Sequence, residues 1–163
     1  MSDAYNIYAG HRDPQVPGAT LAETLWADLE AAFGIQFNGD ACGKSPSFTW
    51  RESERWLSVW VAVPPDRDEP DHSHPARVTA HQPDSGAWAQ RVFDALDATG
   101  RYSLFMIEDD HALVRTNSES ARTQWDDPGR SPGPHPRGRP LTPCPAGEPE
   151  RMRRGAPGYR AAS

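Results

Sequence analysis

The chain has 163 residues, 36% of them hydrophobic and 25% charged, and its formal net charge is −6 at pH 7. Residues 1–5 lack the basic start and apolar run of a secretory signal, and no apolar run reaches the length of a membrane span. The two cysteines, Cys42 and Cys144, form neither a CxxC pair nor a metal-binding spacing. We therefore expect reduced thiols in a cytoplasmic protein that does not contact a membrane.

Charge is unevenly distributed along the chain. Residues 128–163 hold seven of the 17 basic residues and two of the 23 acidic ones. Residues 1–127 therefore hold 10 basic and 21 acidic residues, a balance of −11. Because an acidic domain repels phosphate backbones, this balance argues against nucleic-acid binding by the domain itself.

The first predicted elements are a strand over residues 5–9 and a helix beginning at Thr20. Thr20 and Glu23 form a capping-box pattern, in which each side chain accepts the other residue's backbone N–H. Apolar residues then recur at helical spacing, and the predicted buried stripe is Leu21, Leu25, Leu29, Ala32 and Phe33. Gly34 supplies a left-handed cap that ends the helix, and residues 35–37 are a short strand candidate.

The strongest strand signal is the octet 56–63, which is rich in β-branched and aromatic residues. One face would carry Trp56, Ser58, Trp60 and Ala62, and the other Leu57, Val59, Val61 and Val63. Both faces are largely apolar, which predicts a central strand buried on both sides. Residues 47–50 should pair with the octet in a hairpin that turns through residues 51–55.

The second half of the domain contains three more strands and one more helix. A strand over residues 76–81 precedes a helix whose N-cap is Asp84 and which Gly100 ends. The predicted buried stripe of this helix is Trp88, Val92, Ala95 and Leu96. Strands over 102–107 and 112–115 follow. Short connections favour antiparallel neighbours, so the fold class is α+β: a mostly antiparallel sheet of about five to seven strands, with two helices on one face.

The composition changes at about Asn117. Residues 128–163 contain nine prolines and six glycines, with almost no aliphatic side chains. Such a segment buries too little apolar surface to offset its backbone entropy. We therefore predict a compact domain over residues 1–116 and a disordered, Arg-rich tail over 117–163. The tail could bind nucleic acid as a basic arm, serve as a spacer, or fold back on its acidic domain.

Two acidic clusters fall on predicted loops, and carboxylates of this kind steer basic partners into contact. Two tryptophans beside the first hairpin turn are the aromatic candidates for the same contact. The predicted partner-binding residues are Asp66, Asp68, Glu69, Asp71, Glu108, Asp109, Asp110, Trp50 and Trp56.

The 66–74 loop also contains His72 and His74, whose spacing suits a metal if the segment is a strand. Pro70 and Pro75 argue against a strand there, so a solvated loop is the expectation. No catalytic residue, metal site or cofactor is predicted, because no phosphate loop, nucleophile elbow or zinc motif is present.

The function expected from these features is that of a small acidic interaction protein with a basic protein partner. Immunity-type inhibitors of toxin or nuclease domains offer the nearest analogy, one of charge and size alone. Two alternatives remain open: a metal-dependent enzyme that uses the Asp/His loops, and a nucleic-acid-binding protein that acts through its Arg-rich tail.

Overall fold

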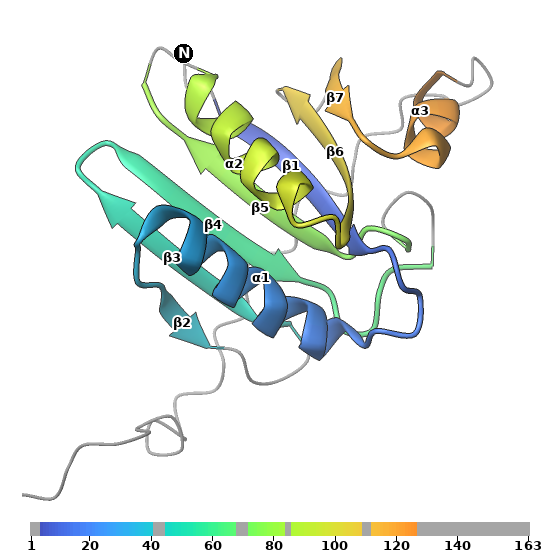
Figure 1. Cartoon of the computed structure of the whole chain (residues 1–163), viewed down its shortest axis with the longest axis horizontal. Helices are drawn as coiled ribbons and strands as arrows, with labels where there is room; N and C mark the ends of the chain where they lie inside the picture. The colour runs from blue at the N-terminus through green and yellow to red at the C-terminus, as the bar shows by residue number, and fades with distance from the viewer. Residues whose placement is uncertain (1–3, 41–44, 68–71, 84–85, 109–111, 127–163) are drawn as a thin grey trace, which may run out of the picture.

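The computed structural model describes residues 4–40, 45–67, 72–83, 86–108 and 112–126. In chain order the elements are β1 (Ala4–His11), α1 (Gly18–Phe33), β2 (Asn38–Asp40), β3 (Ser47–Glu52), β4 (Arg55–Val61), β5 (Ala76–His81), α2 (Ala87–Ala98), β6 (Tyr102–Glu108), β7 (Ala112–Thr116) and α3 (Glu119–Asp126). The strands form one sheet in the order β2-β3-β4-β5-β1-β6-β7, and every neighbouring pair is antiparallel. Helices α1 and α2 lie on the same face of this sheet (Figure 1). The predicted α+β class and its two helices on one face are confirmed.

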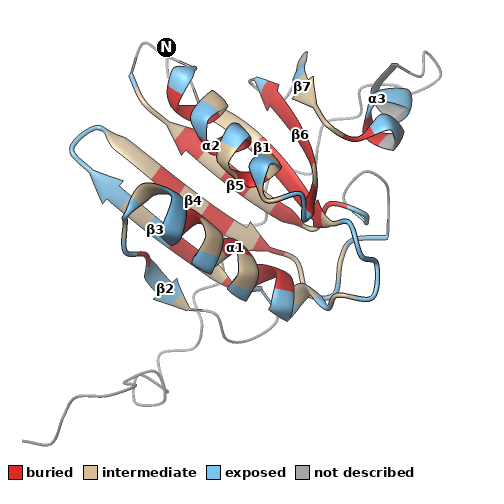
Figure 2. Cartoon of the chain, viewed as in Figure 1, coloured by how far each residue is buried: buried red, intermediate tan, exposed pale blue. Residues whose placement is uncertain are grey.

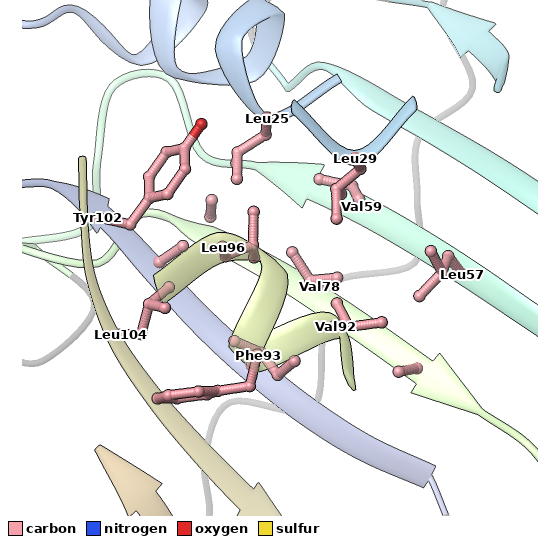
Figure 3. Packing of buried hydrophobic residues seen from close by; sticks show 14 of the residues in the cluster. Leu25, Leu29, Leu57, Val59, Val78, Val92, Phe93, Leu96, Tyr102 and Leu104 are labelled. Carbon is pink, nitrogen blue, oxygen red and sulfur yellow. The ribbon is translucent and has the colours of Figure 1, made fainter. Parts of the chain in front are cut away.

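The hydrophobic core lies between the sheet and helices α1 and α2. Alternation along the strands sends every second side chain of β4 and β5 toward the helices. Figure 3 shows these side chains meeting the apolar stripes of the two helices, and the same positions are the buried stretches in Figure 2. The residues at the centre of this layer include Leu25, Leu29, Leu57, Val59, Val78, Val92, Phe93 and Leu96, each at most 1% exposed.

Strand β4 is an interior strand, as predicted, but only one of its faces is buried. Leu57, Val59 and Val61 point toward the helices and are fully buried. Trp56 and Trp60, on the other face, are half-buried. The prediction of burial on both sides is therefore wrong for the described residues. The apolar outer row reflects tryptophan rings that lie against residues of the neighbouring strand β5, and no described helix packs on them.

Helix α1 begins earlier than its sequence pattern predicted. It starts at Gly18 and has no side-chain cap, so the predicted capping box is wrong. Thr20 lies inside the first turn, where its carbonyl accepts the Thr24 hydroxyl at 2.7 Å. In the buried stripe, Ala32 is exposed, and Ala22 is buried in its place. The Gly34 cap is confirmed, with φ 64° and its N–H donating to the Glu30 carbonyl at 2.9 Å.

Residues 35–37 do not form the expected strand, which starts instead at Asn38. Phe37 turns into the core, with its ring 5.8 Å from that of Trp26 and 4.8 Å from that of Phe48. The Phe37 N–H donates to the Glu30 carboxylate at 2.8 Å, so this backbone group is satisfied by a side chain and not by a neighbouring strand. The hairpin between β3 and β4 is also tighter than predicted, because only residues 53–54 connect its strands.

Helix α3 lies in the segment that the sequence assigned to the tail. Its Ala121 is 3% exposed and packs with Tyr8, Phe105 and Ile107 in a small cluster on the sheet face opposite α1 and α2. Asn117 fixes the chain before α3, because its side-chain oxygen accepts the Leu104 N–H at 2.7 Å. Regular structure therefore continues to Asp126. The rest of the predicted tail, residues 127–163, and the predicted N-cap Asp84 lie outside the described residues.

A buried tyrosine joins α1 to β6. The Tyr102 hydroxyl donates to the Asp28 carboxylate at 2.6 Å, and Arg101 donates to both oxygens of that carboxylate, at 2.8 and 3.0 Å. Burial first, and then the Asp28 carboxylate, raise the pKa of Tyr102 well above its ordinary value of 10.0. The folded protein therefore holds this proton more tightly than the unfolded chain does.

Stability should consequently fall at high pH through Tyr102. Above about pH 10 the unfolded chain loses the Tyr102 proton while the folded chain keeps it, so the free energy of unfolding drops by up to about 1.4 kcal/mol per pH unit. Tyr102→Phe should be about 1 kcal/mol less stable at pH 8, through the lost hydrogen bond, and should decline less steeply above pH 10. Urea unfolding of both proteins from pH 8 to 11 measures this difference. Parallel declines would contradict it.

Candidate functional site

The two described members of the predicted acidic clusters, Asp66 and Glu108, lie toward opposite ends of the strands. Strand β1 pairs Tyr5 with Glu108, at the end of the sheet where β5 finishes. At the other end Ala9 pairs with Ala76, next to the point where β4 leads into the 62–75 loop that contains Asp66. Four residues along β1 separate these positions, a distance of about 13 Å. Among the described residues, Asp66 and Glu108 therefore do not belong to one acidic surface.

The two described members of these clusters are exposed to solvent. The Asp66 carboxylate accepts the N–H of Arg67 at 3.0 Å, and the Glu108 carboxylate accepts the Tyr5 hydroxyl at 3.1 Å. Within the described part of the chain neither carboxylate forms a salt bridge. Asp68, Glu69, Asp71, Asp109 and Asp110 lie outside the described residues.

The two histidines of the 62–75 loop have different environments. His72 is exposed, and its Nδ1 lies 2.9 Å from the Asp66 carbonyl oxygen. His74 is 2% exposed, with its ring nitrogens hydrogen-bonded to the Ser73 and Ser103 hydroxyls at 2.9 and 2.8 Å. His74 thus anchors the loop to β6. Among the described residues, no group of three or more His, Cys, Asp or Glu side chains is placed to hold a metal ion.

Trp50 and Trp56, predicted as neighbouring partner contacts, lie on opposite faces of the sheet. Trp50 pairs with Leu57 on the helix side, and its ring is 5.9 Å from that of buried Trp88. The Arg55 guanidinium lies 5.3 Å from the Trp50 ring and 4.6 Å from the Trp88 ring. A shallow open hollow borders Trp50 and Arg55 at the end of α1. Trp50 is therefore mainly a packing residue.

Trp56 belongs to a different environment, the face of β4 and β5 that points away from α1 and α2. Its ring stacks on that of His81, with centroids 5.4 Å apart and planes 21° apart. Four residues along β4, Trp60 pairs with Arg77, whose guanidinium lies 5.8 Å from the Trp60 ring. We call this surface, formed by the outward residues of β3, β4 and β5 together with Asn6 of β1, the open face.

The tryptophans of the open face stand apart from the other described tryptophan side chains. Trp26 and Trp50 are half-buried against the main core, and Trp88 is part of it, whereas Trp56 and Trp60 pack against neither buried cluster. Between them, at the centre of the open face, the Thr79 hydroxyl donates to the Asn6 side-chain oxygen at 2.8 Å. The open face is thus a polar centre flanked by two aromatic positions.

The charge of the open face is opposite to that of the domain as a whole. Strand alternation and register place Arg51, Arg77 and His81 on it. Within the described parts of β1 to β5, the one carboxylate on this side is Asp40, on the edge strand β2. Sequence reasoning missed this surface because it assigned Trp60 to the core. The polar Ser58 between the two tryptophans was the available signal that the row faces solvent.

No known protein family matches the chain, and no curated protein or solved structure is significantly similar to it. None of the described helices is long and apolar enough to cross a bilayer.

Proposed function

We propose that the protein is a non-catalytic, cytoplasmic interaction protein, which binds a basic protein partner through carboxylates at the ends of its strands. The observation that supports this proposal is the contrast between two kinds of acid. Asp28 and Asp94 are paired with Arg101 and Arg115 at 2.8 and 2.6 Å. Glu108, like Asp66, is exposed and has no such cation among the described residues.

Exposed carboxylates without an internal cation leave a net negative potential at the surface. Such a field attracts a basic partner and raises its association rate, and salt weakens the attraction over a Debye length of about 8–10 Å. In sequence, Glu108 is followed directly by Asp109 and Asp110. Trp56 lies toward the same end of the strands as Glu108 but on the opposite face of the sheet, because Tyr5, the cross-strand partner of Glu108, packs against the main core.

The role that fits these features is inhibition of a basic toxin or nuclease domain, by analogy of charge and size with immunity-type inhibitors. In that role the carboxylates occupy positions that substrate phosphates would take on the target. The Glu108–Asp110 cluster is the primary contact in this proposal, because two further acids follow Glu108 directly in the sequence, whereas Arg67 follows Asp66.

Affinity capture with matched baits tests the proposal. The baits are the full-length protein, a variant with Glu108→Gln, Asp109→Asn and Asp110→Asn, and a control that removes the same charge from exposed Glu23, Glu54 and Glu119. A basic protein retained by the wild type and the control, but lost from the cluster variant, is the expected result. Equal retention by all three baits would contradict the proposal.

Association kinetics with the captured partner give a quantitative prediction. The cluster variant should associate about tenfold more slowly at low salt, and its rate should depend less on ionic strength, because less of the steering field remains. Its free energy of unfolding should change by less than about 0.5 kcal/mol, since these side chains are on the surface. Stopped-flow measurement of the association rate at about 20 to 500 mM salt tests this prediction, because the Debye length changes severalfold over that range. A rate indifferent to both salt and the substitutions would count against it.

A further inference from the structure

We infer that the open face binds single-stranded nucleic acid, with Trp60/Arg77 and Trp56/His81 as two positions on which bases stack. The inference does not rest on the proposed function, because it uses none of the carboxylates at the strand ends. It starts from the two tryptophans of the open face. Both are half-buried and lie outside the main core and the small cluster beneath α3. Their described neighbours are cross-strand partners on the sheet surface, His81 and Arg77.

The geometry of each pair suits a planar, negatively charged ligand. Trp60 lies beside the Arg77 guanidinium at 5.8 Å, and Trp56 is stacked on His81 at 5.4 Å. Every base offers a π-face for an indole ring to stack on, and a guanidinium plane can stack on a base or pair with a phosphate. Four strand residues separate the two tryptophans, about 13 Å, which gives two separate stacking positions on one strand.

Polar side chains fill the interval between the two positions. Thr79 and Asn6 are hydrogen-bonded to each other at 2.8 Å, and Ser58 is the cross-strand partner of Thr79. Hydroxyl and amide groups can donate to and accept from base edges and sugars, which an apolar surface cannot do. An open sheet face with stacking aromatics and polar neighbours is a recurrent way of binding single strands.

Charge decides between the possible occupants. The open face carries Arg51, Arg77 and His81, and its one carboxylate among the described parts of β1 to β5 is Asp40, at the β2 edge. A basic partner would be repelled, and so would the chain's own segment 128–163, with its seven arginines. An acidic polypeptide would match the charge, but it lacks the planar groups that two ring positions accommodate. Single-stranded nucleic acid matches both features.

The acidity of the domain as a whole does not prevent such binding. Exposed charges farther apart than a Debye length, about 8 Å at physiological salt, are largely screened from each other. A phosphate in contact with Arg77 therefore responds mainly to the charges of the open face. The Arg-rich segment 128–163 adds sequence-independent attraction for the same strand.

Fluorescence anisotropy of the full-length protein with labelled dT12 and rU12 tests the inference. Trp60→Leu, which keeps an apolar side chain but removes the ring, should weaken binding about tenfold to a hundredfold. Trp60→Phe, which keeps a ring, should retain most of the affinity. Arg77→Gln should weaken binding. It should also make the slope of log affinity against log salt concentration shallower by about 0.7, the value for one phosphate contact on a single strand. Arg91→Gln is the matched control, because Arg91 lies 5.7 Å from the Trp88 ring on the helix side and should leave the affinity unchanged.

Three results would overturn the inference. The first is no binding of either oligonucleotide by the wild type. The second is equal binding by wild type and Trp60→Leu, which would place the site on the Arg-rich segment. The third is polyglutamate that binds the wild type as tightly as dT12 does, with an affinity that Arg77→Gln lowers and Trp60→Leu leaves unchanged. That result would identify an acidic polypeptide as the occupant. Since no variant here alters Glu108, these outcomes are separate from failure of the proposed function.

Discussion

Replacing Phe48 with alanine should lower the free energy of unfolding by about 3–5 kcal/mol. Phe48 is 1% exposed, and its ring lies 4.7 Å from that of Trp26 and 4.8 Å from that of Phe37. Removing the ring leaves a cavity between stiff aromatic neighbours that cannot collapse into it, so the loss of contacts adds to the loss of burial. Urea unfolding, with the slope unchanged between the two proteins, measures the difference.

Trp60→Ala is the matched control, since it removes an even larger ring from the neighbouring strand. Trp60 pairs with Ser47, next to Phe48 in β3, but on the opposite face of the sheet. Because the open face is only half-buried, the expected cost is about 1 kcal/mol or less. A loss as large as that of Phe48→Ala would show that the open face is covered, and the one-sided core would be wrong.

The second large effect is expected at Gly10. A Cβ on this residue would lie only 1.8 Å from the Ser73 carbonyl oxygen and 2.9 Å from the Ser73 carbonyl carbon, both backbone atoms. Ser73 precedes His74, whose ring is fixed to Ser103 at 2.8 Å, so the loop cannot move without breaking this anchor. Gly10→Ala should therefore destabilise the protein by about 3 kcal/mol, as overpacking does.

Gly34→Ala provides the comparison for Gly10→Ala. A Cβ at Gly34 meets nothing within 4 Å, but φ is 64°, so only left-handed backbone strain opposes it. Its expected cost is about 1 kcal/mol. Equal losses at the two positions, measured by urea unfolding, would contradict the close approach of the loop to β1.

The sequence predicted most of the strands and both large helices, because their signals are local. Alternation along β5 placed Val78 and Ala80 inward, and helical spacing placed Leu21 and Leu25 in the core; both placements are confirmed. Gly34 was identified as a helix cap because glycine adopts the left-handed backbone conformation that commonly ends a helix. Such patterns are set by the chain's own periodicity, which does not depend on long-range contacts.

The errors occurred where tertiary contacts override local preference. The predicted Thr20 capping box does not form, because helix α1 already starts at Gly18. Phe37 was predicted to lie in a strand but does not, because its ring packs in the core against Trp26 and Phe48. Helix α3 was missed because it has few apolar side chains, and its packing depends on Ala121 meeting Tyr8 and Phe105 from distant strands.

The candidate surfaces were predictable only in part, since they depend on strand register. The acidic clusters were visible in the sequence, but register alone places Glu108 and Asp66 at opposite ends of the strands. Trp50 and Trp56 are six residues apart in the sequence yet face opposite sides, because a tight two-residue turn separates them and Trp50 pairs with inward Leu57. The pairs Trp60/Arg77 and Trp56/His81 join two strands that no local pattern aligns.

The central claim is that Trp56 and Trp60 form a solvent-accessible, cationic surface in the full-length protein. Tryptophan fluorescence quenching by iodide and by caesium tests this claim without any partner, because a surface bearing Arg51 and Arg77 concentrates anions and repels cations. After each quenching constant is divided by that of free N-acetyltryptophanamide, iodide should quench the wild type more strongly than caesium, and the difference should largely vanish in the double variant Trp56→Phe/Trp60→Phe. Equal quenching by the two ions, or a double variant that keeps the wild-type difference, would contradict the claim.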